Sequence, residues 1–156
     1  MKARTSGETG FTVLELIIAV AVGALLLSIA VPAYFNHMQR LKVGQASQDL
    51  MAISLALERY RTVHDFKLPD SLDALTGVPA IDPWGRPYEY LNFAAPIPGI
   101  NGKIRKDHNL HPLNTQFDLY SLGADGRSVP PLTARASHDD VIYARDGSFV
   151  GLAKDF

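Results

Sequence analysis

The sequence contains no cysteine, so neither a disulfide bond nor a thiolate metal site can stabilise its fold. Its formal net charge of -1 argues against a surface built to bind a polyanion, and no nucleic-acid partner is expected. None of the five histidines stands at a zinc-ligand spacing with a second good donor. Nucleophile elbows, phosphate-binding loops and dinucleotide fingerprints are absent as well. These absences disfavour an enzyme.

The strongest positive feature is a long apolar run from Phe11 to Phe35, in which Glu15 is the only strongly polar residue. A helix of this length crosses the apolar core of a bilayer, which is roughly 30 Å thick. A cleavable secretory signal would be shorter and would end in small residues. The run therefore predicts a single membrane-spanning helix. Lys2 and Arg4 weakly favour a cytoplasmic N-terminus.

A short motif lies where the polar leader meets this apolar run. Gly10 is followed by Phe11, and Glu15 is the fifth residue counted from Phe11. With the apolar residues between them, they resemble the N-terminal motif of the type IV prepilin family, which includes the pseudopilins of type II secretion. The resemblance implies that a prepilin peptidase removes residues 1–10 and that Phe11 is then N-methylated. It also implies self-assembly into a helical filament, with minor pseudopilins and an inner-membrane assembly platform as partners.

Glu15 needs a reason to lie in a membrane-spanning segment, because a charge there is costly. After cleavage Phe11 would carry a free, positively charged amine. The carboxylate of Glu15 in one subunit can pair with the Phe11 amine of its neighbour, and we expect this pairing to set the axial register of the filament. The alternative is a protonated Glu15 that faces lipid.

The helix is expected to continue beyond the membrane to about His64. Apolar residues then recur at spacings of three and four, which is typical of one face of an amphipathic helix. These residues are Val43, Ala46, Leu50, Ile53, Leu57 and Tyr60. Pro32 removes one backbone hydrogen bond and should kink or loosen the helix. The resemblance implies that the segment around this proline can unwind in assembled filaments.

The rest of the periplasmic domain, residues 36–156, is predicted to form a short helix at 70–75 and a small antiparallel sheet. Alternating or apolar segments predict strands at 88–92, 117–122, 141–143 and 149–150. The intervening segments at 94–116 and 127–139 are read as loops. The predicted fold is α+β and pilin-like: a long N-terminal helix, half of it transmembrane (residues 11–35), packed on the sheet.

Two further segments, 82–90 and 117–126, resemble the major pseudopilins of type II secretion. That resemblance fails between Ala94 and Gln116, where this chain carries a long insert. A small basic cluster stands in the insert: Lys103, Arg105, Lys106 and His108. Short charge runs are usually solvated, so we expect a solvated loop, with a contact to DNA or to an acidic neighbour as the alternative.

The resemblance also implies a calcium-binding loop after residue 121. The matching ligands are the carbonyl of Leu122 and the carboxylates of Asp125 and Asp140. His138 stands where the family has another aspartate, and Asp139 could substitute for it. Several oxygen ligands suit this hard cation, whereas neutral imidazole does not. The alternative is that the two loop aspartates are solvated and that Asp125 serves only its turn.

The expected function is that of a structural subunit, a pseudopilin of the periplasmic filament of a type II secretion machinery. The protein would be anchored in the inner membrane by a single span, with its C-terminal domain in the periplasm. A pilin of a type IV pilus is one alternative. An adhesin or other binding module on a pilin anchor, with the insert as its binding surface, is another.

Overall fold

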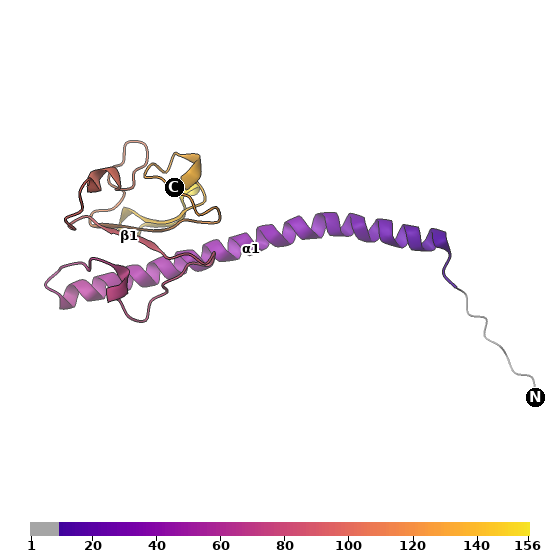
Figure 1. Ribbon diagram of the computed structural model, residues 1–156, viewed down its shortest axis with the longest axis horizontal. Coiled ribbons are helices and arrows are strands. Elements are labelled where there is room, and N and C mark those ends of the chain that lie inside the picture. Colours follow the sequence, from indigo (N-terminus) through magenta and orange to yellow (C-terminus); the bar gives the residue numbers. More distant parts are fainter. Residues whose placement is uncertain (1–9) are drawn as a thin grey trace, which may run out of the picture. The chain divides into compact units, whose positions relative to one another are not determined.

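The computed structural model describes residues 10–156, and the chain divides into one unit that ends at Gln39 and a second from Arg40 to Phe156. A single long helix, α1 (Val13–Val63), runs through both units. The strands that follow are β1 (Glu89–Asn92), β2 (Phe117–Ser121), β3 (Val141–Ala144) and β4 (Phe149–Leu152). Short 3₁₀ turns lie between them (Figure 1). The α+β fold and all four predicted strands are confirmed, whereas the leader at residues 1–9 lies outside the described residues.

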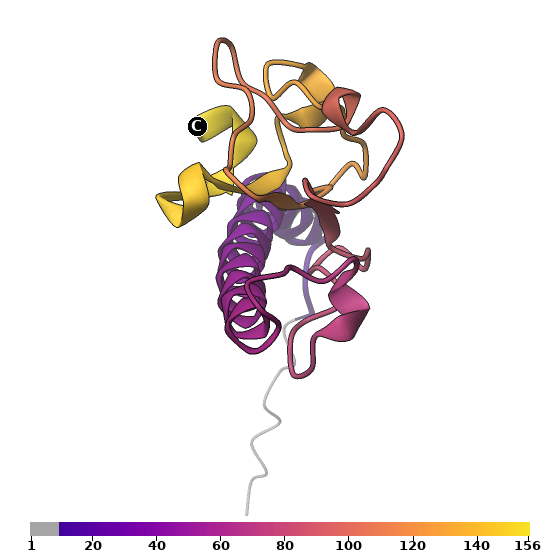
Figure 2. The same cartoon turned by 90° about the vertical axis from the view of Figure 1, so that its left-hand side faces the viewer.

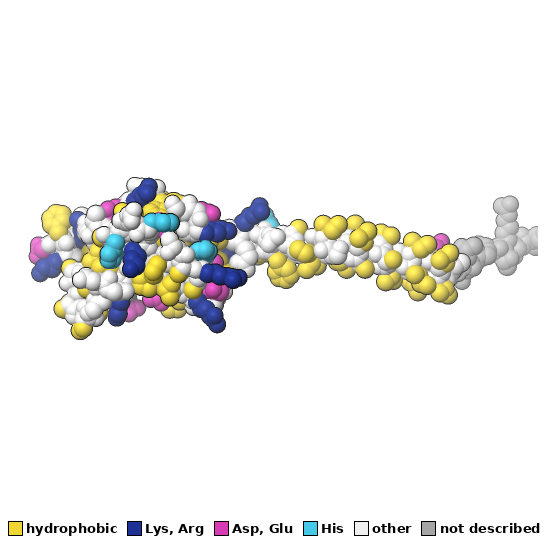
Figure 3. Space-filling model, turned by 90° about the horizontal axis from the view of Figure 1, so that it is seen from above, with side chains coloured by type: hydrophobic (Ala, Val, Ile, Leu, Met, Phe, Trp, Pro, Cys, Tyr) yellow, Lys and Arg dark blue, Asp and Glu magenta, His cyan; other side chains and the backbone are white. Residues whose placement is uncertain are grey.

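The first unit contains the beginning of α1, and the large apolar side chains from Phe11 to Phe35 are exposed. Figure 3 shows apolar side chains along the visible face of this segment. An 18-residue window of α1 has a mean hydropathy of 2.6, and none of that window is buried. By length and composition this helix can cross a membrane. It continues through Pro32 as one helix, so the proline does not end it. The unwinding expected in filaments stays a prediction.

The strands of the second unit form an antiparallel sheet in the order β1-β2-β3-β4. In the middle of this sheet, Leu119 of β2 pairs with Tyr90 of β1 and with Tyr143 of β3. Because side chains alternate along a strand, Leu119 points to one face of the sheet, while its neighbours Asp118 and Tyr120 point to the other. Different segments of the chain pack on the two faces of the sheet.

Residues 40–63 of α1 cover the first face (Figure 2). Their apolar stripe Ala46, Leu50, Ile53 and Leu57 is completely buried. It packs against a cluster from the sheet and the turn before it, which consists of Tyr88, Phe117, Leu119 and Val141. The amphipathic face predicted from spacing is therefore confirmed. Trp84 is partly buried and also packs against this core.

Irregular segments, rather than a helix, cover the opposite face, and a second core lies beneath them. This core consists of Leu113, Leu132, Ile142, Ala144 and Ala153. The insert at 94–116 contains no strand of the sheet, as predicted, but it contributes to this layer. Ile104, Arg105 and Leu113 are all 9% exposed or less. The prediction that the basic cluster of the insert is solvated is therefore wrong for Arg105, because the insert covers a sheet face that would otherwise be open to water.

Candidate functional site

The N-terminal candidate site begins at the first turn of α1. The backbone N–H and the side-chain hydroxyl of Thr12 both donate to Glu15 Oε2, at 3.2 and 3.3 Å. In return the backbone N–H of Glu15 donates to Thr12 Oγ1 at 3.2 Å. This reciprocal pattern is a capping box, which satisfies helix N–H groups that have no partner inside the helix. This role was not predicted above, although Thr-x-x-Glu at a helix start is its known sequence signal.

The predicted cleavage site lies just before this turn. Gly10 and Phe11 precede the first residue of α1 and are exposed, with 84% of Phe11 accessible. A Cβ atom added at Gly10 would meet nothing within 4 Å. The fold therefore does not require glycine here. Cleavage after Gly10 and methylation of Phe11 stay predictions.

The second candidate site is the loop between β2 and β3, and it is anchored by the turn that precedes β1. Asp82 is 4% exposed, and its Oδ1 accepts backbone N–H groups of Trp84 and Arg86 at 3.0 and 2.9 Å. Its other oxygen accepts the Ser121 hydroxyl at 2.6 Å. These bonds fix the proline-rich turn against the end of β2. They also aim Arg86 at the loop.

Arg86 then binds backbone carbonyls at the start of the loop. Its Nη1 donates to the carbonyl of Gly123 at 2.7 Å, and Nη2 donates to that of Ala124 at 3.4 Å. Gly123 has a φ of +63°, and a Cβ there would lie 2.1 Å from the carbonyl oxygen of Asp139. Only glycine allows both this backbone conformation and this approach. Gly123 at the beginning of the loop and Asp139 at its end thereby lie against each other.

The predicted calcium ligands take part in turn contacts at this point. The Leu122 carbonyl accepts the Gly126 N–H at 3.2 Å, and Asp125 Oδ1 accepts the Arg127 N–H at 2.8 Å. Asp139 Oδ2 accepts the backbone N–H of Asp125 at 2.8 Å. Within residues 10–156, no three or more His, Cys, Asp or Glu side chains form a group that could hold a metal ion. Calcium binding stays a prediction.

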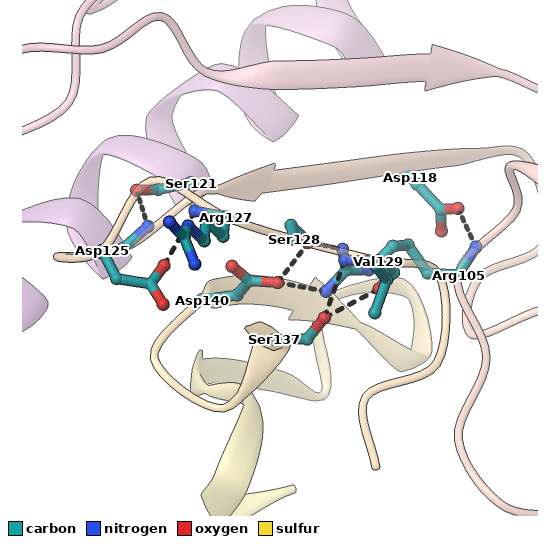
Figure 4. A network of polar contacts seen from close by, with 10 residues as sticks. Arg105, Asp118, Ser121, Asp125, Arg127, Ser128, Val129, Ser137 and Asp140 are labelled. Atoms are coloured by element: carbon teal, nitrogen blue, oxygen red, sulfur yellow. Dashed lines mark hydrogen bonds and ion pairs between the residues drawn. The ribbon is translucent and has the colours of Figure 1, made fainter. Parts of the chain in front are cut away.

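Asp140, the remaining predicted ligand, takes no part in these turn contacts and is completely buried. Its Oδ2 accepts from Arg105 Nη2 at 2.5 Å and from the Ser128 hydroxyl at 2.6 Å (Figure 4). Arg105 Nη1 also donates to Ser128 Oγ. Burial raises the pKa of Asp140 to about 6, although the hydrogen bonds from Ser128 and Arg105 act in the opposite direction.

Arg105 was expected to belong to a solvated basic cluster, and this expectation is wrong. It is only 2% exposed, and its guanidinium lies 4.2 Å from the centre of the Tyr120 ring, a cation–π contact. Its backbone N–H donates to Asp118 Oδ2 at 2.6 Å. The other basic residues of the cluster, among them Lys103, are exposed as predicted. Nothing in the sequence around Arg105 distinguishes it from its basic neighbours.

Comparison with known proteins gives similar chains along most of this sequence. The type II secretion system core protein G of Pseudomonas aeruginosa is 33% identical over 141 residues, which cover 77% of this chain and 86% of that protein. The Vibrio cholerae protein of the same name is 27% identical over 139 residues, with 77% and 83% covered. Fimbrial protein EcpB of Eikenella corrodens is 30% identical over 76 residues, 49% of this chain and 40% of that protein. No protein-family profile and no solved structure matches.

Proposed function

Because this chain belongs to the family of the type II secretion system core protein G and is a pseudopilin subunit, we propose that it reaches its filament through its N-terminal segment. It is made as an inner-membrane precursor with its C-terminal domain in the periplasm. A prepilin peptidase cuts it after Gly10, and Phe11 is methylated. The mature subunit then polymerises on an inner-membrane assembly platform, together with minor pseudopilins.

The observation that carries this proposal is the exposed apolar surface of α1 in the first unit. Leu14, Ile17 and Leu25 are each more than half exposed, and other apolar side chains along the segment are similar. In water, each such side chain would cost about 1.5–3 kcal/mol relative to a buried one. A subunit that leaves the bilayer must therefore bury α1 against copies of itself. A filament with α1 segments in its core meets this need.

Glu15 is the one strongly polar side chain in this apolar segment. Its hydrogen bonds to Thr12 cap the helix but add no opposite charge. Inside a filament core the carboxylate would be buried without a cation, which is costly. The amine of Phe11 from a neighbouring subunit supplies that cation. Because the pairing is possible at one offset between helices, it sets the axial register.

The test separates the charge of Glu15 from its role as a helix cap. Glu15→Gln keeps the side-chain oxygen of a capping box and removes the charge. We expect the variant to insert into the membrane normally but to yield at least about tenfold less filament. The Phe11 amine of the neighbouring subunit would be buried without an opposite charge, which costs several kcal/mol. The assay is expression in a type II secreting bacterium that lacks its own major pseudopilin, followed by sedimentation of filaments.

The matched control is Thr12→Ala, which weakens the cap and leaves the charge, so it should still assemble. Because the chain has no cysteine, single engineered cysteine pairs can report the subunit register without background crosslinks. Wild-type filament yield and register in Glu15→Gln would refute the role of the charge.

Gly10→Leu should keep the leader attached, and the lower mobility of the uncleaved chain on a denaturing gel would show it.

The two alternatives receive less support. Similarity to a fimbrial protein covers 49% of this chain, against 77% for the core protein G of Pseudomonas aeruginosa. An adhesin reading requires an insert that can be deleted without loss of the fold. Residues 94–116 instead contribute Ile104, Arg105 and Leu113 to the buried layer over the sheet. We therefore expect that deleting the insert destabilises the domain, as well as removing any surface that it presents.

A further inference from the structure

The loop between β2 and β3 does not fit the calcium site that the family resemblance implies. Calcium takes six to eight oxygen ligands, usually including several carboxylates and waters. Asp140 is completely buried and already faces a guanidinium 2.5 Å away. A divalent ion bound to Asp140 would meet this fixed positive charge at close range. Asp140 Oδ1 has no hydrogen-bond partner among the described residues, but within residues 10–156 no three or more His, Cys, Asp or Glu side chains form a group that could complete a calcium shell.

We propose that Arg105, carried by the insert at 94–116, is the built-in cation that holds this loop in place of calcium. The C-terminal domain then folds and keeps its stability without any divalent metal. This inference concerns the domain after Gln39 and is independent of how α1 assembles.

The contacts of Arg105 join segments that are far apart in the sequence. Its guanidinium binds Asp140, just before β3, and Ser128 in the loop (Figure 4). It also lies over the ring of Tyr120 of β2. The Ser128 hydroxyl also donates to Asp140, so the three polar side chains close a ring. A metal ion in such a loop would act in the same way, by drawing distant oxygens to one positive centre.

The two buried atoms that lack a partner in this network belong to the same ion pair. They are Arg105 Nε and Asp140 Oδ1. A planar guanidinium can pair two N–H groups with both oxygens of one carboxylate, the bidentate arrangement that arginine favours. Lysine could not form this arrangement, because it presents a single point charge.

The backbone of the insert holds Arg105 in position. On one side of it, the N–H of Lys106 donates to the carbonyl of Pro130 at 3.1 Å, and the Lys106 carbonyl accepts the Leu132 N–H at 2.9 Å. The insert and the loop therefore run beside each other as a short bridge. These bonds fix the backbone that carries the Arg105 side chain, which lowers the entropic cost of the pairing.

Arg86 performs a similar task at the other end of the loop. Its guanidinium binds the carbonyls of Gly123 and Ala124. Backbone carbonyls in such a turn are oxygen donors of the kind that calcium accepts. Two arginines thus engage both classes of oxygen in this loop, carboxylate and carbonyl.

The first experiment needs no variant. The chain has one tryptophan, Trp84, and it packs against the core on the α1 side of the sheet. Its fluorescence therefore follows unfolding of the C-terminal domain in the full chain, purified in detergent. We expect the melting temperature to agree within about 1 °C in millimolar calcium chloride and in excess chelator, since a ligand that binds the folded state would raise it. A fall of several degrees in chelator would overturn the proposal.

The second experiment tests the charge of Arg105. Arg105→Met keeps most of the side-chain length but leaves Asp140 buried without a cation, so we expect the melting temperature to fall by about 10 °C or more. The matched control is Lys103→Met, an exposed basic residue of the same insert, for which we expect a change of at most about 2 °C. An unchanged melting temperature in Arg105→Met would overturn the proposal.

A double variant distinguishes the cation from mere packing. Adding Asp140→Asn to Arg105→Met removes the unpaired carboxylate, so we expect the double variant to recover part of the lost melting temperature. A purely packing role for Arg105 predicts no recovery, and that result would refute the assignment. If Arg105→Met fails to fold, the calcium comparison on the wild-type chain still decides the question.

Discussion

Replacing Asp118 with asparagine should change how the stability of the C-terminal domain depends on pH. Asp118 is 1% exposed and lies on the face of β2 that points away from α1. Burial raises the pKa of its carboxyl from 3.8 to about 6, against the opposing effects of the Arg105 N–H bond, the Arg105 charge and Asn114. The shift of roughly two units corresponds to about 3 kcal/mol between the two protonation states.

The sign follows from the direction of the shift. A carboxyl whose pKa is raised in the folded state binds more protons there than in the unfolded chain. The stability contributed by the neutral Asp118 is therefore fully present below about pH 4 and is lost as pH rises through about 6. Asparagine cannot ionise, and its amide oxygen can still accept the bond from the Arg105 N–H.

The measurement is urea unfolding of the full chain in detergent at pH 4, 5, 6 and 7, followed by tryptophan fluorescence. The free energy of unfolding of the wild type, minus that of Asp118→Asn, should fall by up to about 3 kcal/mol between the two ends of this range. Asp140 titrates in both proteins, so its contribution largely cancels. Asp155→Asn, at an exposed carboxyl, controls for the general effect of acid. A difference that is constant or rises with pH would refute the reasoning.

Two further predictions concern packing and the loop, and the same fluorescence-detected unfolding checks both. Leu50→Ala should lower the free energy of unfolding by about 2–5 kcal/mol, because Leu50 is completely buried. Met51→Ala should hardly change it, because Met51 is 57% exposed. Equal effects would contradict the conclusion that the Leu50 side of α1 faces the core. Gly123→Ala should be strongly destabilising, because the new Cβ would lie 2.1 Å from a backbone oxygen. Gly99 also has a positive φ but has open space around it, so Gly99→Ala should lower the free energy of unfolding by only about 1 kcal/mol. Similar losses at both glycines would show that backbone strain, rather than close approach, limits the loop.

Sequence reasoning succeeded where the signal lies between residues that are close in the chain. The spacing of Ala46, Leu50 and Ile53 predicts the buried face of α1, because a helix repeats every 3.6 residues. Alternation at 117–121 similarly predicts β2, because side chains of a strand alternate between two faces. The capping box of Thr12 and Glu15 was equally local, and its Thr-x-x-Glu pattern could have revealed it.

Sequence reasoning failed for the insert, and the reason is physical. Residues 94–116 have no helical or strand period, because an irregular segment that covers a sheet face has no repeating relation to that face. Polar and apolar residues follow one another there in no regular order. The segment therefore looks solvated, although it lies over the second core.

The amino-acid sequence by itself determined the long helix, the strands and the motif at Gly10, Phe11 and Glu15. Only the tertiary structure decided which basic residue of the insert is buried and which carboxylate it meets. The pair Arg105–Asp140 joins residues 35 positions apart, and the neighbouring Lys103 stays in water. A buried guanidinium is tolerated only where a carboxylate offsets its lost hydration, and that place exists only after the loop and the insert have folded over the sheet.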